Sequence, residues 1–343
     1  VPASTENMTP EDIQEIIELG DKTENEARLT NIWADPHAGA VFVSQASSSP
    51  ILRFVDSATG HIYDALRGED PNKISNVTIP QIKEALWGKN GKSLVLRYLK
   101  EDSSIQSFSA TVSTSSISTA ISGTFLPANI KAIRVSDGQV LYANPGKVSG
   151  SIYLADISGS KRSEVFNSSF TDWAISFENQ KTAFLYSKPS GFEPGYGFLL
   201  DLARGTATKI GAEAYGLEGT ISPSGSHIFL SYTEDSIIRS SAYSIAKKAY
   251  VDIVPGTFAS KCAWSMIEST TIYCAIPKNP DSGTYPDDWY KGLVSFSDSI
   301  WKIDVETGEM ELLLDPVLEG EMFDVSELVI GPQDKEIAIT NKK

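Results

Sequence analysis

The fold is decided by the stretch Gly219-Thr220-Ile221-Ser222-Pro223-Ser224-Gly225-Ser226-His227-Ile228-Phe229-Leu230. It reads as an apolar strand, a short Ser-Pro-x-Gly turn and a second apolar strand. Degenerate copies occupy residues 84–95 and 328–338. The first strand of each such unit is expected to end near Val43, Trp87, Val135, Phe177, Ile221, Trp264 and Ile330. These positions are mostly about 42 to 48 residues apart, which is the period of a four-stranded propeller blade.

The repeats therefore predict an all-β fold: a single β-propeller of four-stranded blades. Seven blades are expected if residues 325–330 and 335–340 form a blade of their own, and six is the alternative. Several blades carry an Asp-bearing hairpin before the outermost strand, as in residues 201–205 and 304–308. In such hairpins Asp can bond its own backbone and Gly supplies a positive φ.

The first 26 residues precede the repeats and form a lead-in with a short N-terminal helix. The helix is expected to start at residues 9–12, where Thr can cap it and Pro fits its first turn. Residues 27–343 form the propeller. Residues 27–31 resemble an outermost strand and are predicted to close the ring against the C-terminal blade. Because the chain begins at Val1, we expect that a leader, anchor or tag has been removed.

Charge excludes some classes of partner. The 343 residues include 44 acidic and 29 basic side chains, giving a formal net charge of −15. Nucleic acid and anionic lipid surfaces both require a basic surplus, so neither is expected as a partner. The sequence contains no run of about 18 apolar residues, so it predicts no membrane span.

The two cysteines predict a disulfide. Cys262 and Cys274 flank a turn at residues 267–270, so they should lie opposite each other on antiparallel strands. A bond between them would place the protein in an oxidising, extracytoplasmic compartment. The alternative is that both are small buried hydrophobic residues inside a blade.

The strand–Ser-Pro-x-Gly–strand unit resembles the TolB-like, WD40-like propeller repeat across about residues 27–340. The Gly-His and Trp-Asp dipeptides that are typical of true WD40 repeats do not recur along this chain. Residues 79–87 and 282–290 resemble stretches of uncharacterised exported propeller proteins of small-genome bacteria. The resemblance implies a fold and no mechanism. TolB-like propellers also cap prolyl-oligopeptidase-type enzymes, but the sequence contains no Gly-x-Ser-x-Gly elbow.

Two long loops between second and third strands, residues 188–196 and 277–297, are expected to rim the same propeller face. The predicted ligand-binding residues in them are Phe192, Tyr196, Tyr285, Asp287, Asp288, Trp289 and Tyr290. Exposed rings can stack on sugars or anchor peptides, and Asp287 and Asp288 would supply polar contacts. The alternative is that the aromatic side chains fold inward and staple their own loop.

No catalytic set and no metal site are predicted. His37, His61 and His227 fall in different blades without metal-ligand spacing. Calcium held by Asp287, Asp288 and backbone carbonyls is the one cofactor left open.

These observations favour a monomeric, non-enzymatic, extracytoplasmic binding module that takes a protein or carbohydrate ligand at the loop rim. One alternative is a carbohydrate-active lyase or hydrolase that uses acids in the propeller channel. The other is a structural component of the cell surface or envelope.

Overall fold

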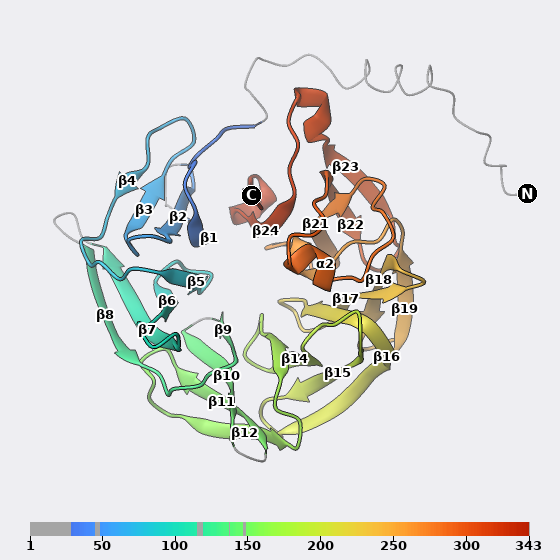
Figure 1. Cartoon of the computed structure of the whole chain (residues 1–343), viewed down its shortest axis with the longest axis horizontal. Helices are drawn as coiled ribbons and strands as arrows, with labels where there is room; N and C mark the ends of the chain where they lie inside the picture. The colour runs from blue at the N-terminus through green and yellow to red at the C-terminus, as the bar shows by residue number, and fades with distance from the viewer. Residues whose placement is uncertain (1–28, 45–48, 115–118, 137, 147–148, 343) are drawn as a thin grey trace, which may run out of the picture.

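The computed structural model describes residues 29–44, 49–114, 119–136, 138–146 and 149–342. Sheets radiate around a central axis and form a ring (Figure 1). The arrangement is compatible with the predicted seven blades, which we number in chain order.

Blade 1 contains β1 (His37–Val43), β2 (Ile51–Asp56), β3 (Ile62–Ala65) and β4 (Asn72–Lys73). Blade 2 contains β5 (Ile82–Trp87), β6 (Ser93–Leu99), β7 (Ile105–Thr114) and β8 (Thr119–Phe125). Blade 3 contains β9 (Ala132–Ser136), β10 (Gln139–Pro145), β11 (Gly150–Asp156) and β12 (Ser163–Ser168).

Blades 4 and 5 are fused by one long strand. Their continuous sheet runs β13 (Trp173–Ser176), β14 (Thr182–Ser187), β15 (Pro194–Asp201), β16 (Thr206–Ile221), β17 (His227–Glu234), β18 (Ile237–Ser244) and β19 (Ala249–Ile253). The first part of β16 pairs with β15 as far as Tyr215, and the second part pairs with β17. The same strand is therefore outermost in blade 4 and innermost in blade 5.

Blade 6 contains β20 (Cys262–Trp264), β21 (Thr271–Pro277), β22 (Asp298–Asp304) and β23 (Met310–Leu314). Blade 7 is represented by a two-stranded sheet of β24 (Val325–Ile330) and β25 (Ile337–Asn341). In the part of the chain that the structure describes, the helical segments are η1 (Ala259–Lys261), α2 (Asp287–Tyr290), η2 (Pro316–Glu319) and η3 (Pro332–Asp334). Among the described residues, no helix combines the length and apolar character needed to span a bilayer.

The positions predicted for the end of the first strand of each repeat agree with the structure. These strands end at Val43, Trp87, Ile221, Trp264 and Ile330, as expected from the sequence, and the other two end within one residue of their marks. The core lies between neighbouring blades. Ile62 of blade 1 packs with Leu94 of blade 2, for example, and both are fully buried. Each such side chain stabilises the fold by about 1.5–3 kcal/mol through burial.

The two ends of the ring meet through blades 1 and 7. In Figure 1, β1 lies beside β24, and His37 Nε2 is 2.9 Å from Thr340 Oγ1. Residues 29–31 belong to no strand, and residues 27–28 lie outside the described residues, so the predicted closing strand is not seen. The predicted N-terminal helix also lies outside the described residues.

Candidate functional site

The long connections gather at one end of the propeller, which we call the loop face. It carries residues 188–193, 235–236, 254–261, 278–297 and 315–324, which join second to third strands or one blade to the next. Figure 1 shows α2, within residues 278–297, in front of the inner ends of blades 5 and 6. The backbone N–H of Gly191 donates to Asp287 Oδ2 over 2.7 Å, and the Thr233 hydroxyl donates to the Tyr285 carbonyl over 3.0 Å. The two long loops therefore share one face, as predicted.

Two of the predicted stacking anchors are buried. Tyr285 and Trp289 are 1% and 2% exposed, and both pack on Phe258 with ring-centre distances of 5.8 and 5.3 Å. Neither ring can stack on a ligand in this structure, so the expectation that they are binding anchors is wrong for these two residues. Instead they staple the loop, which was the alternative interpretation.

The adjacent carboxylates also serve the loop. Asp287 accepts the Gly191 N–H and lies 3.5 Å from Lys291 Nζ, while Asp288 accepts the Thr284 N–H over 2.8 Å. In the described part of the chain, no group of three or more His, Cys, Asp or Glu side chains could hold a metal ion. Calcium at Asp287 and Asp288 remains a prediction.

Three predicted aromatic residues are exposed on the loop face. Phe192 and Tyr290 are 65% and 52% exposed, and Tyr196 is also exposed. Lys291 Nζ lies 5.2 Å from the centre of the Phe192 ring, and Lys209 Nζ lies 5.1 Å from that of Tyr196. Such cation–π contacts hold rings in place while leaving part of their surface open.

Tyr290 combines an exposed ring with an anchored hydroxyl. Its OH donates to Glu218 Oε1 over 2.5 Å, and Glu218 Oε2 accepts the Ser260 N–H over 3.2 Å. Burial raises the pKa of Glu218, and burial together with Glu218 raises the pKa of Tyr290. The ring is therefore fixed in position over blade 5.

Sequence reasoning missed other apolar residues at this end of the propeller. Exposed large hydrophobic side chains on the loop-face connections or beside them are Tyr215, Ile237, Val254, Leu293, Val317, Leu318 and Met322. Together with Phe192, Tyr196 and Tyr290 they make up the set of exposed side chains at this end of the ring that we call the apolar patch. The available signal was the occurrence of large apolar residues inside turn-rich segments such as 315–322, where solvent-exposed loops are usually polar.

Buried charges hold the base of the long loop. Lys261 is fully buried, and its Nζ lies 2.6 Å from Asp298 and 2.8 Å from Asp324. Trp289 Nε1 also donates to Asp324 over 2.8 Å, and Lys342 donates to the Trp289 carbonyl. These contacts join the loop, η1 and blade 7 into one unit.

The predicted disulfide between Cys262 and Cys274 is confirmed. The two residues are direct partners of β20 and β21, as expected from their distances to the turn. Cys274 is fully buried in the core between blades 5 and 6.

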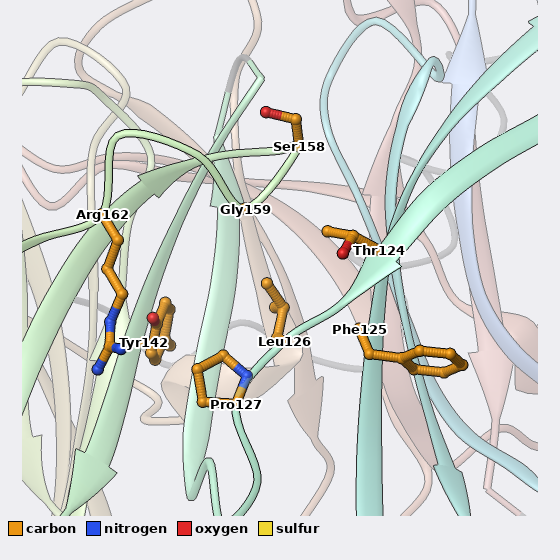
Figure 2. A pocket seen from close by; sticks show the side chains of 8 residues that line it. All are labelled: Thr124, Phe125, Leu126, Pro127, Tyr142, Ser158, Gly159 and Arg162. Atoms are coloured by element: carbon orange, nitrogen blue, oxygen red, sulfur yellow. The ribbon is translucent and has the colours of Figure 1, made fainter.

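A surface pocket of about 410 Å³ lies away from the loop face, between β8 and the hairpin that joins β11 to β12. Figure 2 shows Arg162 and Tyr142 on one side of it and Phe125 on the other. The Arg162 guanidinium lies 3.9 Å from the centre of the Tyr153 ring.

No protein-family model and no curated protein sequence matches the chain. Similar solved structures include a puromycin-hydrolyzing peptidase from Mycobacterium tuberculosis, with 12% identity, a TM-score of 0.56, and coverage of 84% of this chain and 46% of the peptidase. Hydrazine synthase from Kuenenia stuttgartiensis has 10% identity, a TM-score of 0.56, and coverage of 93% and 99%. TolB from Acinetobacter baumannii has 14% identity, a TM-score of 0.48, and coverage of 79% and 61%.

The chain thus spans about half of the peptidase and less than two thirds of TolB. At these identities the likeness concerns the fold alone. The β-propeller arrangement predicted from the repeats is confirmed as a fold, and function has to be argued from the site.

Proposed function

We propose that the protein is a non-enzymatic binding module that docks a protein partner through the apolar patch. The observation that carries this proposal is the concentration of exposed large hydrophobic side chains, including Phe192, Tyr290 and Leu293, at one end of the ring. Clustered exposed apolar side chains are typical of interaction surfaces, and Tyr and Phe are effective anchors there.

The loops that carry the patch are held before any partner arrives. Asp287 fixes the loop of Phe192, Glu218 fixes the Tyr290 hydroxyl, and Trp289 is stapled beneath. A preorganised surface loses little conformational entropy on binding, so more of the contact energy appears as affinity.

A protein partner is favoured over a carbohydrate by the state of the carboxylates. Asp287 and Asp288 accept backbone N–H groups within the loop face, so they have less capacity to accept sugar hydroxyls. Aliphatic side chains such as Val254 and Leu318 are also exposed on the loop-face connections. The disulfide supports an extracytoplasmic setting, because such bonds persist in oxidising compartments.

The proposal is tested with a photo-crosslinking amino acid placed at residue 192 or 293, and at Phe125 as a control. Phe125 has nearly the same exposure as Phe192, 63% against 65%, but lies beside the pocket of Figure 2. We expect one protein to crosslink from both loop-face positions in the producing cells and not from position 125. The purified partner should bind Phe192→Ala/Leu293→Ala at least 10-fold more weakly than wild type, with Phe125→Ala unchanged.

Equal binding by all three proteins would contradict the proposal. A glycan and cell-wall-fragment array, probed with wild type and Phe192→Ala/Tyr196→Ala, addresses the other ligand class. A specific array signal lost in that variant would replace the protein partner by a carbohydrate. Product release from the array ligands would instead favour the lyase or hydrolase alternative, and reproducible self-association would favour the structural one.

A further inference from the structure

A second site lies on the propeller axis. A cavity of about 330 Å³ is lined by residues from the first strands of the blades and from the turns that follow them. Lys89 and Glu178, in the turns after β5 and β13, are among the lining residues, so the cavity reaches the end opposite the loop face. Its volume is at the lower end of the range for small-molecule pockets.

The cavity contains an arginine and a glutamate, Arg134 and Glu327, that form no direct ion pair with each other. Arg134 comes from β9 and Glu327 from β24, and in Figure 1 these strands lie on opposite sides of the ring centre. Arg134 Nη1 donates to the Ile133 carbonyl over 2.8 Å, and Glu327 bonds the Thr340 hydroxyl. Within the described residues, neither side chain has an ion-pair partner within 4.0 Å.

The other charged pair in the cavity behaves differently. Lys89 Nζ lies 3.3 Å from Glu178 Oε2, so those two charges already compensate each other. An arginine and a carboxylate left apart in a partly dehydrated space are costly unless water or a ligand satisfies them. The planar guanidinium group of Arg134 is suited to binding a carboxylate, and the carboxylate of Glu327 is suited to binding an ammonium group.

Aromatic side chains complete the wall. Phe42 and Trp87 line the same cavity, and the Trp87 indole N–H is taken by the Gly39 carbonyl over 3.3 Å. Their remaining surface is apolar and suits an apolar side chain.

We propose that this cavity binds a small zwitterion of the α-amino acid class. Its carboxylate would lie on Arg134, its ammonium group on Glu327, and its apolar side chain against Phe42 and Trp87. Arg134 and the ionised form of Glu327 match such a ligand in both sign and number, so the binding measurements are made at pH 8. A neutral sugar would leave the two charges uncompensated, and a dicarboxylate or diamine would mismatch one of them.

The test is isothermal titration calorimetry of the purified protein with L-phenylalanine and L-leucine. Each is compared with an analogue that lacks one charge: 3-phenylpropionate lacks the ammonium, phenethylamine lacks the carboxylate, and glucose serves as the neutral control. We expect at least 10-fold weaker binding of either analogue than of L-phenylalanine. Failure of wild type to bind any α-amino acid at 10 mM, or binding of glucose alone, would overturn the proposal.

Charge-removing variants assign the two ends of the ligand. We expect Arg134→Gln to weaken L-phenylalanine at least 10-fold while leaving phenethylamine unchanged. Glu327→Gln should do the reverse, sparing 3-phenylpropionate. Arg204→Gln, at an exposed outer hairpin, is the matched control and should bind like wild type. Amino acid binding that neither Arg134→Gln nor Glu327→Gln changes would place the ligand elsewhere and contradict the proposal.

This site is independent of the proposed docking surface. The Phe192→Ala/Leu293→Ala variant should keep its amino acid affinity, because both residues lie at the other end of the ring. Loss of partner docking with retained amino acid binding, or the reverse, therefore distinguishes the two proposals.

Discussion

Two connections at opposite ends of neighbouring blades are built in contrasting ways. The turn at residues 222–226 is held by local bonds: Ser222 Oγ accepts the N–H groups of Ser226 and His227, each over 3.1 Å. Residues 278–297 are held by contacts distant in sequence, including Trp289 to Asp324 and Tyr290 to Glu218. The repeat can be recognised where local bonds set the backbone. The buried rings of Tyr285 and Trp289 and the exposed side chains of Tyr290 and Leu293 all lie in residues 278–297, where a long loop interrupts the repeat.

The largest expected effect comes from removing the charge beneath the long loop. Lys261→Met leaves Asp298 and Asp324 buried without their main counter-charge, so we expect a loss of about 3–5 kcal/mol of unfolding free energy. Denaturation in guanidinium chloride measures it. The control is Lys209→Met, an exposed lysine paired with Glu213, which should change stability by less than about 0.5 kcal/mol.

An equal, small effect of both lysine substitutions would contradict this difference. It would mean that the long loop, like the short turn, depends mainly on its own local bonds. A large effect confined to Lys261 would show that the loop face and blade 7 unfold as one unit.

The same contrast explains what could be predicted from the sequence. The ends of β5, β16 and β20 were predicted because apolar strands and Gly-containing turns are local patterns that repeat. The Cys262–Cys274 pairing followed from counting residues back from one turn. The orientation of Tyr285 and Trp289 could not be predicted, because it depends on Phe258 and Asp324, whose proximity arises only when the ring forms.

The pairing of Arg134 with Glu327 in the cavity on the propeller axis could not be predicted from the sequence either. Arg134 and Glu327 are separated by almost two hundred residues and occur in strands that contain no other charged residue. Each resembles an ordinary surface charge of a strand until the ring brings the first strands together. Phe192, Tyr196 and Tyr290 were identified correctly as exposed loop aromatics, since loops lie on the surface.

The next prediction concerns Glu327, which lines the cavity on the propeller axis, and the pH dependence of the unfolding free energy. Burial raises the pKa of Glu327 to about 7. The native carboxyl therefore keeps its proton where the unfolded chain, with a pKa near 4.3, has lost it. Because the native state then binds more protons, the free energy of unfolding should fall by about 2 kcal/mol as pH rises from about 4.5 to 7.

Urea denaturation across this pH range, on wild type and Glu327→Gln, measures the effect. Burial also raises the pKa of Glu218, so the difference between the two proteins is the quantity that reports on Glu327. The variant should have the shallower decline. Parallel curves would show that the Glu327 carboxyl titrates as it does in the unfolded chain.

The smallest expected effect concerns the single bond that joins the two long loops. Asp287→Ala removes the acceptor of the Gly191 N–H and should cost about 1 kcal/mol, because the carboxylate is partly exposed and its neighbours can recruit water. Asp287→Asn keeps an acceptor oxygen while removing the charge, so it should recover most of the loss. Hydrogen exchange at the Gly191 amide is the direct measurement: exchange should accelerate in the Ala variant and stay near the wild-type rate in the Asn variant. Unchanged exchange in both would mean that the loop of Phe192 is held by its own strands, as the short turn is, and that the docking surface is not preorganised by the long loop.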